Sequence, residues 1–281
     1  VYIVDSGCDI LHPELANASI QKVHNPTNGG FNDFIAGGGD ATAFTIEDDH
    51  GHGTAMASLI GGDAIGVARN ARLGITKISG ADGSADISDV AKGVNSIFVH
   101  RDLASRRDTN GSFRTAVVVM AFTFPKSEAL DRLATYMWNR RLVVCAAAGN
   151  AGGDVDNYSP GGLNSILTVG ASDSSDNVPA FSNDAGAVVE RGTGLQTNGG
   201  EEVDVFAPGV GVNYADVSNR VEIGDYTGVT GDDLKATGSG TSIACAIVAG
   251  VGALVAERYG SGKATADAMK EFITEQSLTG L

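Results

Sequence analysis

Three residues of this chain have the side chains of an activated nucleophile: Ser242, His52 and Asp5. A serine hydroxyl is a poor nucleophile at neutral pH and needs a base, and the imidazole of a histidine titrates in the useful range. A carboxylate beside that imidazole holds it in one tautomer and stabilises the imidazolium. The sequence therefore predicts acyl transfer by a serine, a base and an orienting acid. The three residues lie in the runs Val4-Asp5-Ser6-Gly7, Gly51-His52-Gly53-Thr54 and Gly240-Thr241-Ser242-Ile243-Ala244.

The surroundings of Ser242 favour a developing negative charge. Residues Ile243 to Val255 have a helical pattern, which places the hydroxyl at a helix N-terminus, where N–H groups and the helix dipole stabilise an oxyanion. Taken alone, Ser242 also fits a helix N-cap. Asn150, which follows Gly149 after a strand, also fits a turn when taken alone. Together with Asp5 and His52, both residues are better explained by catalysis.

The order of the motifs is informative because a Ser-His-Asp triad occurs on unrelated folds in different chain orders. Here aspartate comes first, histidine second and serine last, which is the subtilisin order. The chain resembles the subtilisin-like serine proteases over nearly its whole length. The residues around its motifs are most similar to those of the proteinase K branch. The further matching runs are Ala146-Ala147-Ala148-Gly149-Asn150, Ile65-Gly66-Val67-Ala68 and Thr168-Val169-Gly170-Ala171-Ser172.

This resemblance implies a fold and an activity. The implied fold is α/β, a subtilisin-like three-layer α/β/α arrangement with a mainly parallel central sheet, in a single peptidase domain covering residues 1–281. The implied activity is that of a secreted endopeptidase, made as a zymogen, whose partners are polypeptide substrates and its own propeptide. In this family the side chain of Asn150 and the backbone N–H of Ser242 would form the oxyanion hole.

The resemblance also predicts where substrate binds. A peptide would pair as an extra strand with exposed backbone, and the matching positions are Gly83, Ser84, Ala85, Ala121, Phe122, Thr123, Ala148 and Gly149. The run Ala121-Phe122-Thr123-Phe124 replaces the usual Ser-Leu-Gly-Gly, so side chains stand where the family has glycines. We expect a narrowed or reshaped pocket for the residue before the scissile bond. After the serine, Ile243, Ala246 and Ile247 replace the usual Met, Pro and His without loss of a catalytic group.

Metal ions enter the interpretation at two places. By resemblance, a structural calcium ion would be held by the carbonyls of Asn164 and Ile166 and the carboxylate of Asp204, although Asp204 equally fits a solvated strand-end carboxylate. No cofactor is expected for catalysis. A rival hypothesis reads Asp48, Asp49, His50 and His52 as zinc ligands. However, a hydrolytic zinc helix spaces its histidines four apart, and these are two apart.

Composition narrows the class of partner. With 19 basic and 34 acidic residues the formal net charge is -15, which disfavours nucleic acid and anionic membranes. No unbroken apolar run reaches the ~18 residues of a membrane span, and the chain opens directly on a strand, so we expect a mature soluble product. The N-terminal arm that the family has before this strand is apparently absent: it is either missing or was cleaved and lies elsewhere. By resemblance the product would be extracellular. The cysteines Cys8, Cys145 and Cys245 are expected to be buried thiols.

Alternating strand and helix patterns predict a parallel sheet covered by helices. Strands are predicted at residues 1–4, 71–78, 115–122, 142–148, 166–171 and 203–206, and helices at 53–59, 87–98, 130–139 and 243–255. Residues 206–238 are predicted to be surface loops or an extra hairpin. The clusters Gly29-Gly30 and Gly37-Gly38-Gly39 are interpreted as loops, and His12, His24 and His100 as surface or packing histidines.

Two other functional classes stay open at this point. The altered Ala121–Phe124 run and the abrupt N-terminus are compatible with a catalytically impaired subtilisin-fold protein that binds peptides or another protein. The complete set of Asp5, His52, Ser242 and Asn150 argues against it. A metal-dependent hydrolase is the third class, and it would show chelator sensitivity together with an unreactive serine.

Overall fold

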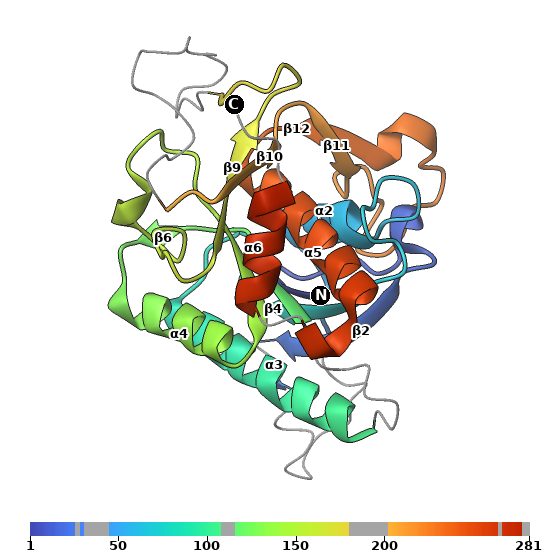
Figure 1. The fold of residues 1–281 in the computed structure, drawn as a ribbon. Helices are drawn as coiled ribbons and strands as arrows, with labels where there is room; N and C mark the ends of the chain where they lie inside the picture. Colours follow the sequence, from blue (N-terminus) through green and yellow to red (C-terminus); the bar gives the residue numbers. More distant parts are fainter. Residues whose placement is uncertain (26–28, 31–44, 108–115, 180–201, 264–265, 277–281) are drawn as a thin grey trace. The chain divides into compact units, whose positions relative to one another are not determined.

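The computed structural model describes residues 1–25, 29–30, 45–107, 116–179, 202–263 and 266–276 (Figure 1). Contacts within the chain divide it into two compact units. The first unit contains Val1–Ala116 and Tyr214–Ala236, and the second contains Val117–Asn213 and Thr237–Leu281. Each unit has its own strands, helices and buried core.

The sheet of the first unit has the strand order β1-β4-β2-β3. Both β1 and β2 run parallel to β4, and the two-residue strand β3 pairs antiparallel with β2. The register places Asp5, the last residue of β1, opposite Lys77. Polar side chains therefore gather at the carboxyl ends of the parallel strands, the end at which sites form in such sheets. The strands are β1 (Tyr2–Asp5), β2 (Ser19–Asn25), β3 (Gly29–Gly30) and β4 (Arg72–Lys77).

Helices pack on this sheet, in which β1 and most of β4 are buried. Helix α2 (His52–Gly61) packs on β1 and β4, and α3 (Ile87–Arg107) packs on β1, β2 and β4. Nine of the ten α2 residues are buried, and most of them are small, which lets the helix approach the sheet closely. A short 3₁₀ helix, η1 (Pro13–Leu15), also contacts α2.

The sheet of the second unit has the strand order β10-β9-β7-β5, with β9 parallel to both of its neighbours. Every residue of β7 and β9 is buried, so both faces of these strands are covered. Strands buried in this way are typical of a parallel sheet in an α/β protein. The strands are β5 (Ala116–Met120), β7 (Leu142–Ala147), β9 (Leu167–Ser172) and β10 (Val205–Pro208).

Three helices pack on the second sheet. Helix α4 (Glu128–Asn139) lies against β7, and α5 (Thr241–Lys263) lies against β7, β9 and β10. Helix α6 (Ala266–Gln276) packs on β7 and on α5, and Figure 1 shows α5 and α6 as the two red helices. The unit also holds the antiparallel pair β6 (Phe124–Pro125) and β8 (Tyr158–Ser159), and the 3₁₀ helix η2 (Val155–Asn157).

The chain also forms a small two-stranded sheet. It consists of β11 (Val212–Ala215) and β12 (Lys235–Gly238), and the 3₁₀ helix η3 (Gly231–Leu234) precedes β12. The pairing of β11 with β12 agrees with the prediction of surface loops or an extra hairpin for residues 206–238.

The main predicted elements are confirmed, with shifted ends, and the α/β class follows from them. Three corrections are needed. Gly29 and Gly30 form strand β3 instead of a loop, because they pair with Asn25 and His24 at the sheet's margin. Strand β2 and helix α6 were not predicted. The cluster Gly37-Gly38-Gly39 lies outside the described residues.

The predicted roles of the cysteines and isolated histidines are confirmed. All three cysteines are buried free thiols, and burial raises the pKa of Cys145 to about 12, so this thiol is unreactive. His12, His24 and His100 are buried packing residues. For example, His100 Nδ1 lies 2.9 Å from the hydroxyl of Tyr2.

One helix is apolar enough to cross a membrane by length and composition, which differs from the sequence expectation. The window Thr241–Arg258 passes that test, and 56% of it is buried within the structure. The sequence was searched for unbroken apolar runs, and this window is not one because hydroxyl residues and glycines interrupt it. Because α5 packs on three strands and on α6, its apolar side chains are accounted for by the core of the second unit.

Candidate active site

Asp5 and His52 form a hydrogen-bonded acid–base pair in the first unit. The carboxylate oxygens of Asp5 lie 2.8 and 3.0 Å from Nδ1 of His52. Asp5 is 7% exposed, and one of its oxygens also accepts a 2.8 Å hydrogen bond from the backbone N–H of Ser6. The contact at Nδ1 fixes the ring and directs Nε2 away from the carboxylate, which is the geometry of a general base.

The charge of Asp5 also sets the protonation of His52. Asp5 raises the pKa of His52 above its ordinary value, against the opposing effect of burial, and Asp48 adds a smaller contribution in the same direction as Asp5. The imidazole keeps 33% of its side chain exposed, so it is accessible from solvent. Asp5 and His52 are therefore in contact, and their catalytic roles stay a prediction.

Two glycines let strand β1 and helix α2 approach closely enough for that contact. A Cβ on Gly53 would lie 2.1 Å from the carbonyl oxygen of Gly7, and a Cβ on Gly7 would lie 2.5 Å from the carbonyl oxygen of Ile46. Gly7 also has a φ of 121°, which side chains rarely adopt. The small residues next to Asp5 and His52 in the sequence are therefore required by packing.

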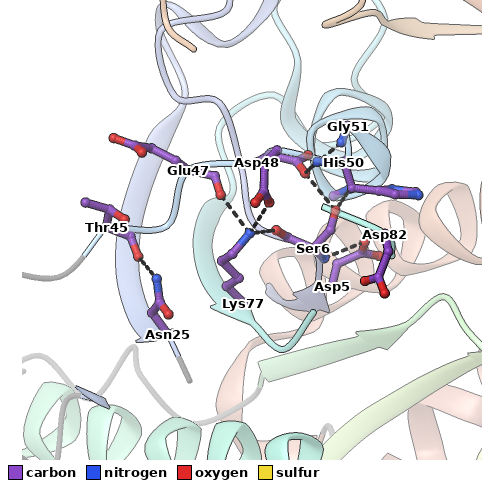
Figure 2. A network of polar contacts seen from close by, with 12 residues as sticks. Asp5, Ser6, Asn25, Thr45, Glu47, Asp48, His50, Gly51, Lys77 and Asp82 are labelled. Atoms are coloured by element: carbon purple, nitrogen blue, oxygen red, sulfur yellow. Dashed lines mark hydrogen bonds and ion pairs between the residues drawn. The ribbon is translucent and has the colours of Figure 1, made fainter. Parts of the chain in front are cut away.

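Asp48 holds the start of helix α2 in place. Its buried carboxylate accepts 2.7 Å hydrogen bonds from the N–H groups of Gly51 and Thr54, and from the hydroxyl of Thr54. It also accepts a 2.8 Å hydrogen bond from Ser6 Oγ (Figure 2). Burial would raise the pKa of Asp48, but these hydrogen bonds outweigh burial and lower it. A carboxylate at a helix N-terminus is favoured by the dipole, so Asp48 positions His52 through the backbone.

Lys77 stabilises the loop on the other side of Asp5. Its ammonium is 2.6 Å from the carbonyl oxygen of Ser6, 2.9 Å from that of Glu47 and 2.6 Å from Asp49 Oδ1. Figure 2 shows Lys77 reaching toward Glu47 and Ser6. Because Lys77 is 7% exposed, these three contacts satisfy a nearly buried cation. They fasten the residue after Asp5 to the segment that carries Asp48.

The hairpin segment predicted at residues 206–238 contributes a further anchor within the first unit. Arg220 donates to Asp9 Oδ2 at 3.0 Å and to the carbonyl oxygen of Asp48 at 2.8 Å. Tyr226 donates its hydroxyl to the same Asp9 oxygen at 2.9 Å. Asp9 is 3% exposed, so this is a buried ion pair. Burial first, and then Asp9, raises the pKa of Tyr226.

These contacts weaken the zinc hypothesis for Asp48, Asp49, His50 and His52. Asp48 is engaged by the helix N-terminus, Asp49 by Lys77 and His52 by Asp5. Among the described residues, no group of three or more His, Cys, Asp or Glu side chains is arranged to hold a metal ion. Each side chain already has a partner that explains its position.

Thr241, Asn150 and Gly149 form a second hydrogen-bonded group, next to Ser242 in the chain of the second unit. Asn150 Oδ1 accepts from the backbone N–H of Thr241 at 2.9 Å and from its hydroxyl at 3.0 Å. The same hydroxyl accepts a 3.0 Å hydrogen bond from the N–H of Gly149. With its oxygen fixed twice, the Asn150 amide presents its NH₂ group as a donor. Thr241 was not predicted as a functional residue, although it lies in the Gly240-Thr241-Ser242 run.

Ser242 lies in the first turn of α5, as predicted. The N–H groups of a first turn have no acceptor within the helix, so the Ser242 N–H can serve an oxyanion. Ser242 Oγ donates a 2.7 Å hydrogen bond to the carbonyl oxygen of Ala121. This bond must break when the hydroxyl gives up its proton.

The predicted substrate segments differ in exposure. In the first unit Gly83 and Ser84 are exposed, Ala85 is half-buried, and Ala85 bridges to Ser79 in antiparallel pairing. A cavity of about 450 Å³, lined in part by Ser84, Ala85 and Lys77, lies beside this segment.

In the second unit the predicted segment after β5 has one exposed residue. Thr123 is exposed, whereas Ala121 is buried and Phe122 is half-buried. The rings of Phe122 and Phe124 pack edge to face with centroids 5.7 Å apart. Ala148 is buried, and Gly149 adopts the left-handed conformation with a φ of 103°. Of the two rings, that of Phe124 stands at a position where the resemblance implies a glycine.

The predicted calcium ligands come together in the second unit, around a side chain that the sequence did not suggest. Lys270 Nζ lies 2.8 Å from the carbonyl oxygen of Asn164, 2.5 Å from that of Ile166 and 2.7 Å from Asp204 Oδ1. Burial raises the pKa of Asp204, and Lys270 opposes that shift. With an ammonium at the centre, these ligands do not fit a calcium ion.

Comparison with known proteins identifies the family. The model of the Subtilase family matches residues 1–279, so the chain belongs to the subtilase family. A cuticle-degrading serine protease of Arthrobotrys oligospora is 31% identical over 100% of this chain and 56% of its own length. Subtilisin-like protease 2 of Pseudogymnoascus destructans is 33% identical over 90% of this chain and 50% of its own.

A solved structure shows the same fold. The crystal structure of a cold adapted subtilisin-like serine proteinase matches with a TM-score of 0.70 and 26% identity, over 98% of this chain and 81% of that one. The predicted resemblance to subtilases of the proteinase K type, and the subtilisin-like α/β fold, are therefore confirmed. The chain spans about half the length of the curated relatives that it matches.

Proposed function

We propose that this chain is the peptidase domain of a secreted serine endopeptidase. The observation that carries the proposal is the 2.8 Å contact between a buried Asp5 carboxylate and Nδ1 of a solvent-accessible His52. It is supported by membership of the subtilase family and by relatives named as serine proteases. The predicted substrates are polypeptides, and the predicted partner during maturation is the protein's own propeptide.

In the proposed mechanism His52 Nε2 takes the proton of Ser242 Oγ as that oxygen attacks the carbonyl carbon of the scissile peptide bond. Asp5 stabilises the imidazolium that forms. The Ser242 N–H and the Asn150 amide donate to the oxyanion of the tetrahedral intermediate. The intermediate collapses as His52 returns the proton to the leaving amine, which gives an acyl-enzyme on Ser242.

The second half of the reaction repeats these steps with water. His52 takes a proton from a water molecule as the water oxygen attacks the acyl carbon, and the Ser242 ester bond breaks in the collapse of the second intermediate. Ser242 Oγ recovers its proton from His52. The product carboxylic acid leaves, and the side chains return to their starting protonation states.

Hydrolysis of dye-labelled casein tests this function. The purified chain should release soluble dye, and the Ser242→Ala variant should release about 10⁶-fold less per unit time, as found for the nucleophile of another enzyme of this family. An equal rate in wild type and variant would show that the release comes from a contaminant. A folded wild type without activity would favour the alternative, a catalytically impaired module that binds peptides.

The segment Ala121–Phe124 sharpens the expected substrate preference. We propose that Phe122 and Phe124, whose rings pack together, narrow the pocket for the residue before the scissile bond. In a series of peptides that differ only at that residue, kcat/KM for Phe should be no higher than kcat/KM for Ala. A clear preference for Phe or Tyr would contradict the narrowed pocket.

A further inference from the structure

Helix α6 supplies a cation to a site built from carbonyl and carboxylate oxygens. Lys270 lies on this helix, and its ammonium contacts two backbone carbonyl oxygens and one carboxylate oxygen at 2.5 to 2.8 Å. These oxygens belong to Asn164, Ile166 and Asp204, which are the residues assigned above to calcium. The three oxygens therefore converge on one positive charge.

The ammonium satisfies this site completely. A lysine ammonium has three N–H donors and no acceptor, and here each donor has one oxygen acceptor. The Lys270 side chain is 19% exposed and that of Asp204 is 13% exposed, so neither charge is left to solvent. The second oxygen of Asp204 accepts a 2.8 Å hydrogen bond from the N–H of Thr168. No partner in this group is missing.

A calcium ion would not bind in addition to this lysine. Calcium takes about 6 to 8 oxygen ligands at about 2.3 to 2.6 Å, and an ammonium bonded to the same oxygens blocks that approach and repels the ion. We propose that Lys270 is a built-in replacement for the structural calcium ion, which holds α6 against the Asn164–Ile166 turn and the start of β10 without any metal. The proposal does not depend on peptidase activity.

Two consequences follow for the protein without bound metal. Its unfolding temperature should not change when calcium or a chelator is added. A variant that lacks the Lys270 ammonium should expose three convergent oxygens to solvent. Hard oxygen ligands with one negative charge suit calcium, with the weak affinity of about 10⁻³ M typical of small extracellular sites. Loss of Lys270 should therefore convert a metal-independent site into a calcium-binding site.

The chain carries its own reporter for this experiment. Its single tryptophan, Trp138 on α4, donates from Nε1 to Asp267 Oδ1 at 2.6 Å, and Asp267 lies in the first turn of α6. Tryptophan emission during heating therefore reports whether α6 stays docked. The measurement is made in the Ser242→Ala background, so that proteolysis does not interfere.

The test compares unfolding midpoints in EDTA and in about 10 mM Ca²⁺, a concentration well above the expected affinity. The parent should change by less than about 1 °C, Lys270→Ala should unfold about 5 °C lower in EDTA, and calcium should restore most of that loss. Adding Asp204→Asn to Lys270→Ala should abolish the restoration. Lys92→Ala, which removes an exposed ion pair with Asp89, is the matched control and should behave as the parent.

Two results would overturn the proposal. One is a parent that loses stability in EDTA, regains it with calcium, and loses that response in the Asp204→Asn variant. The other is a Lys270→Ala protein that calcium stabilises no more than it stabilises the parent. If Lys270→Ala does not fold, Lys270→Met keeps most of the side-chain volume, and the same two comparisons apply to it.

Discussion

The first unit carries the proposed acid–base pair, and the second unit carries the proposed nucleophile and oxyanion donors. Around His52 the first unit places buried carboxylates, Asp5, Asp48 and Asp9, each held by N–H groups, hydroxyls or a cation. Around Ser242 the second unit uses neutral hydrogen bonds made by Thr241 and Asn150. From this difference we infer that nearby charge raises the pKa of the proposed base, His52. The proposed nucleophile Ser242 and the proposed oxyanion donor Asn150 depend instead on the geometry of neutral hydrogen bonds. We expect mutations around His52 to change the pH dependence of activity, and mutations around Ser242 to change kcat alone.

Apart from removal of the Ser242 hydroxyl itself, the largest effect should come from Asp5→Asn, which removes the charge but keeps the shape. We expect kcat to fall by about 10⁴-fold, because the wrong tautomer of His52 becomes favoured. Since Asp5 raises the pKa of His52, the acidic limb of the kcat/KM profile should move to lower pH in the variant. Glu128→Gln, at an exposed ion pair, should change neither.

The same pair predicts how stability depends on pH. A histidine whose pKa is raised on folding is stabilising below its unfolded pKa of about 6.5, and this contribution is lost as pH rises through the folded-state pKa. We therefore compare two proteins in the Ser242→Ala background, one with Asp5 and one with Asp5→Asn. As pH rises through that window, the urea concentration at the unfolding midpoint should fall more for the protein with Asp5 than for the protein with Asp5→Asn. Parallel curves for the two proteins would show that the pair is not charged in the folded state.

Asn150→Ala should have the next largest effect. Removing one oxyanion donor lowers kcat by about 10² to 10³-fold and leaves KM nearly unchanged. The pH profile should keep its shape, because no charge is removed. Asn139→Ala, at the exposed end of α4, is the control. A variant with unchanged kcat would remove Asn150 from the mechanism.

Thr241 should act through Asn150. Thr241→Val keeps the branched shape but loses the hydroxyl that bonds Gly149 and Asn150, so we expect kcat to fall about 10-fold, the equivalent of about one hydrogen bond. Thr241→Ser should restore it. In an Asn150→Ala background, Thr241→Val should cost little more, since contacting residues are not additive. A full additional loss would mean that Thr241 acts independently.

The smallest effect on activity should come from Arg220→Met, which breaks the buried pair with Asp9. We expect unfolding to become easier by about 3 kcal/mol, because Asp9 keeps its charge without its cation. At urea concentrations below the unfolding transition, the activity of this variant should change by less than about threefold. Arg132→Met removes an exposed pair and should cost under about 0.5 kcal/mol. Urea unfolding curves measure both.

The sequence predicted the elements with strong local patterns. Strand β7 was recognisable because its residues are apolar throughout, and helix α5 because residues 243–255 are apolar or glycine. Asp5 and His52 were recognisable because glycines accompany them. Strand β2 was missed since Ser19–Asn25 alternates few apolar residues with polar ones, and it becomes a strand by pairing with β4. Lys270 could not have been predicted to meet the Asn164 and Ile166 carbonyls, because that contact joins residues about a hundred positions apart.

Whether Ser242 is an activated nucleophile is tested most directly by covalent labelling with a fluorophosphonate, followed by intact-mass measurement and peptide mapping. We expect one adduct per chain, on Ser242. This adduct should be absent from Ser242→Ala and should form far more slowly in Asp5→Asn. A folded chain that takes up no label, or labels elsewhere at the same rate as its Ser242→Ala variant, would contradict an activated serine and leave the peptide-binding alternative.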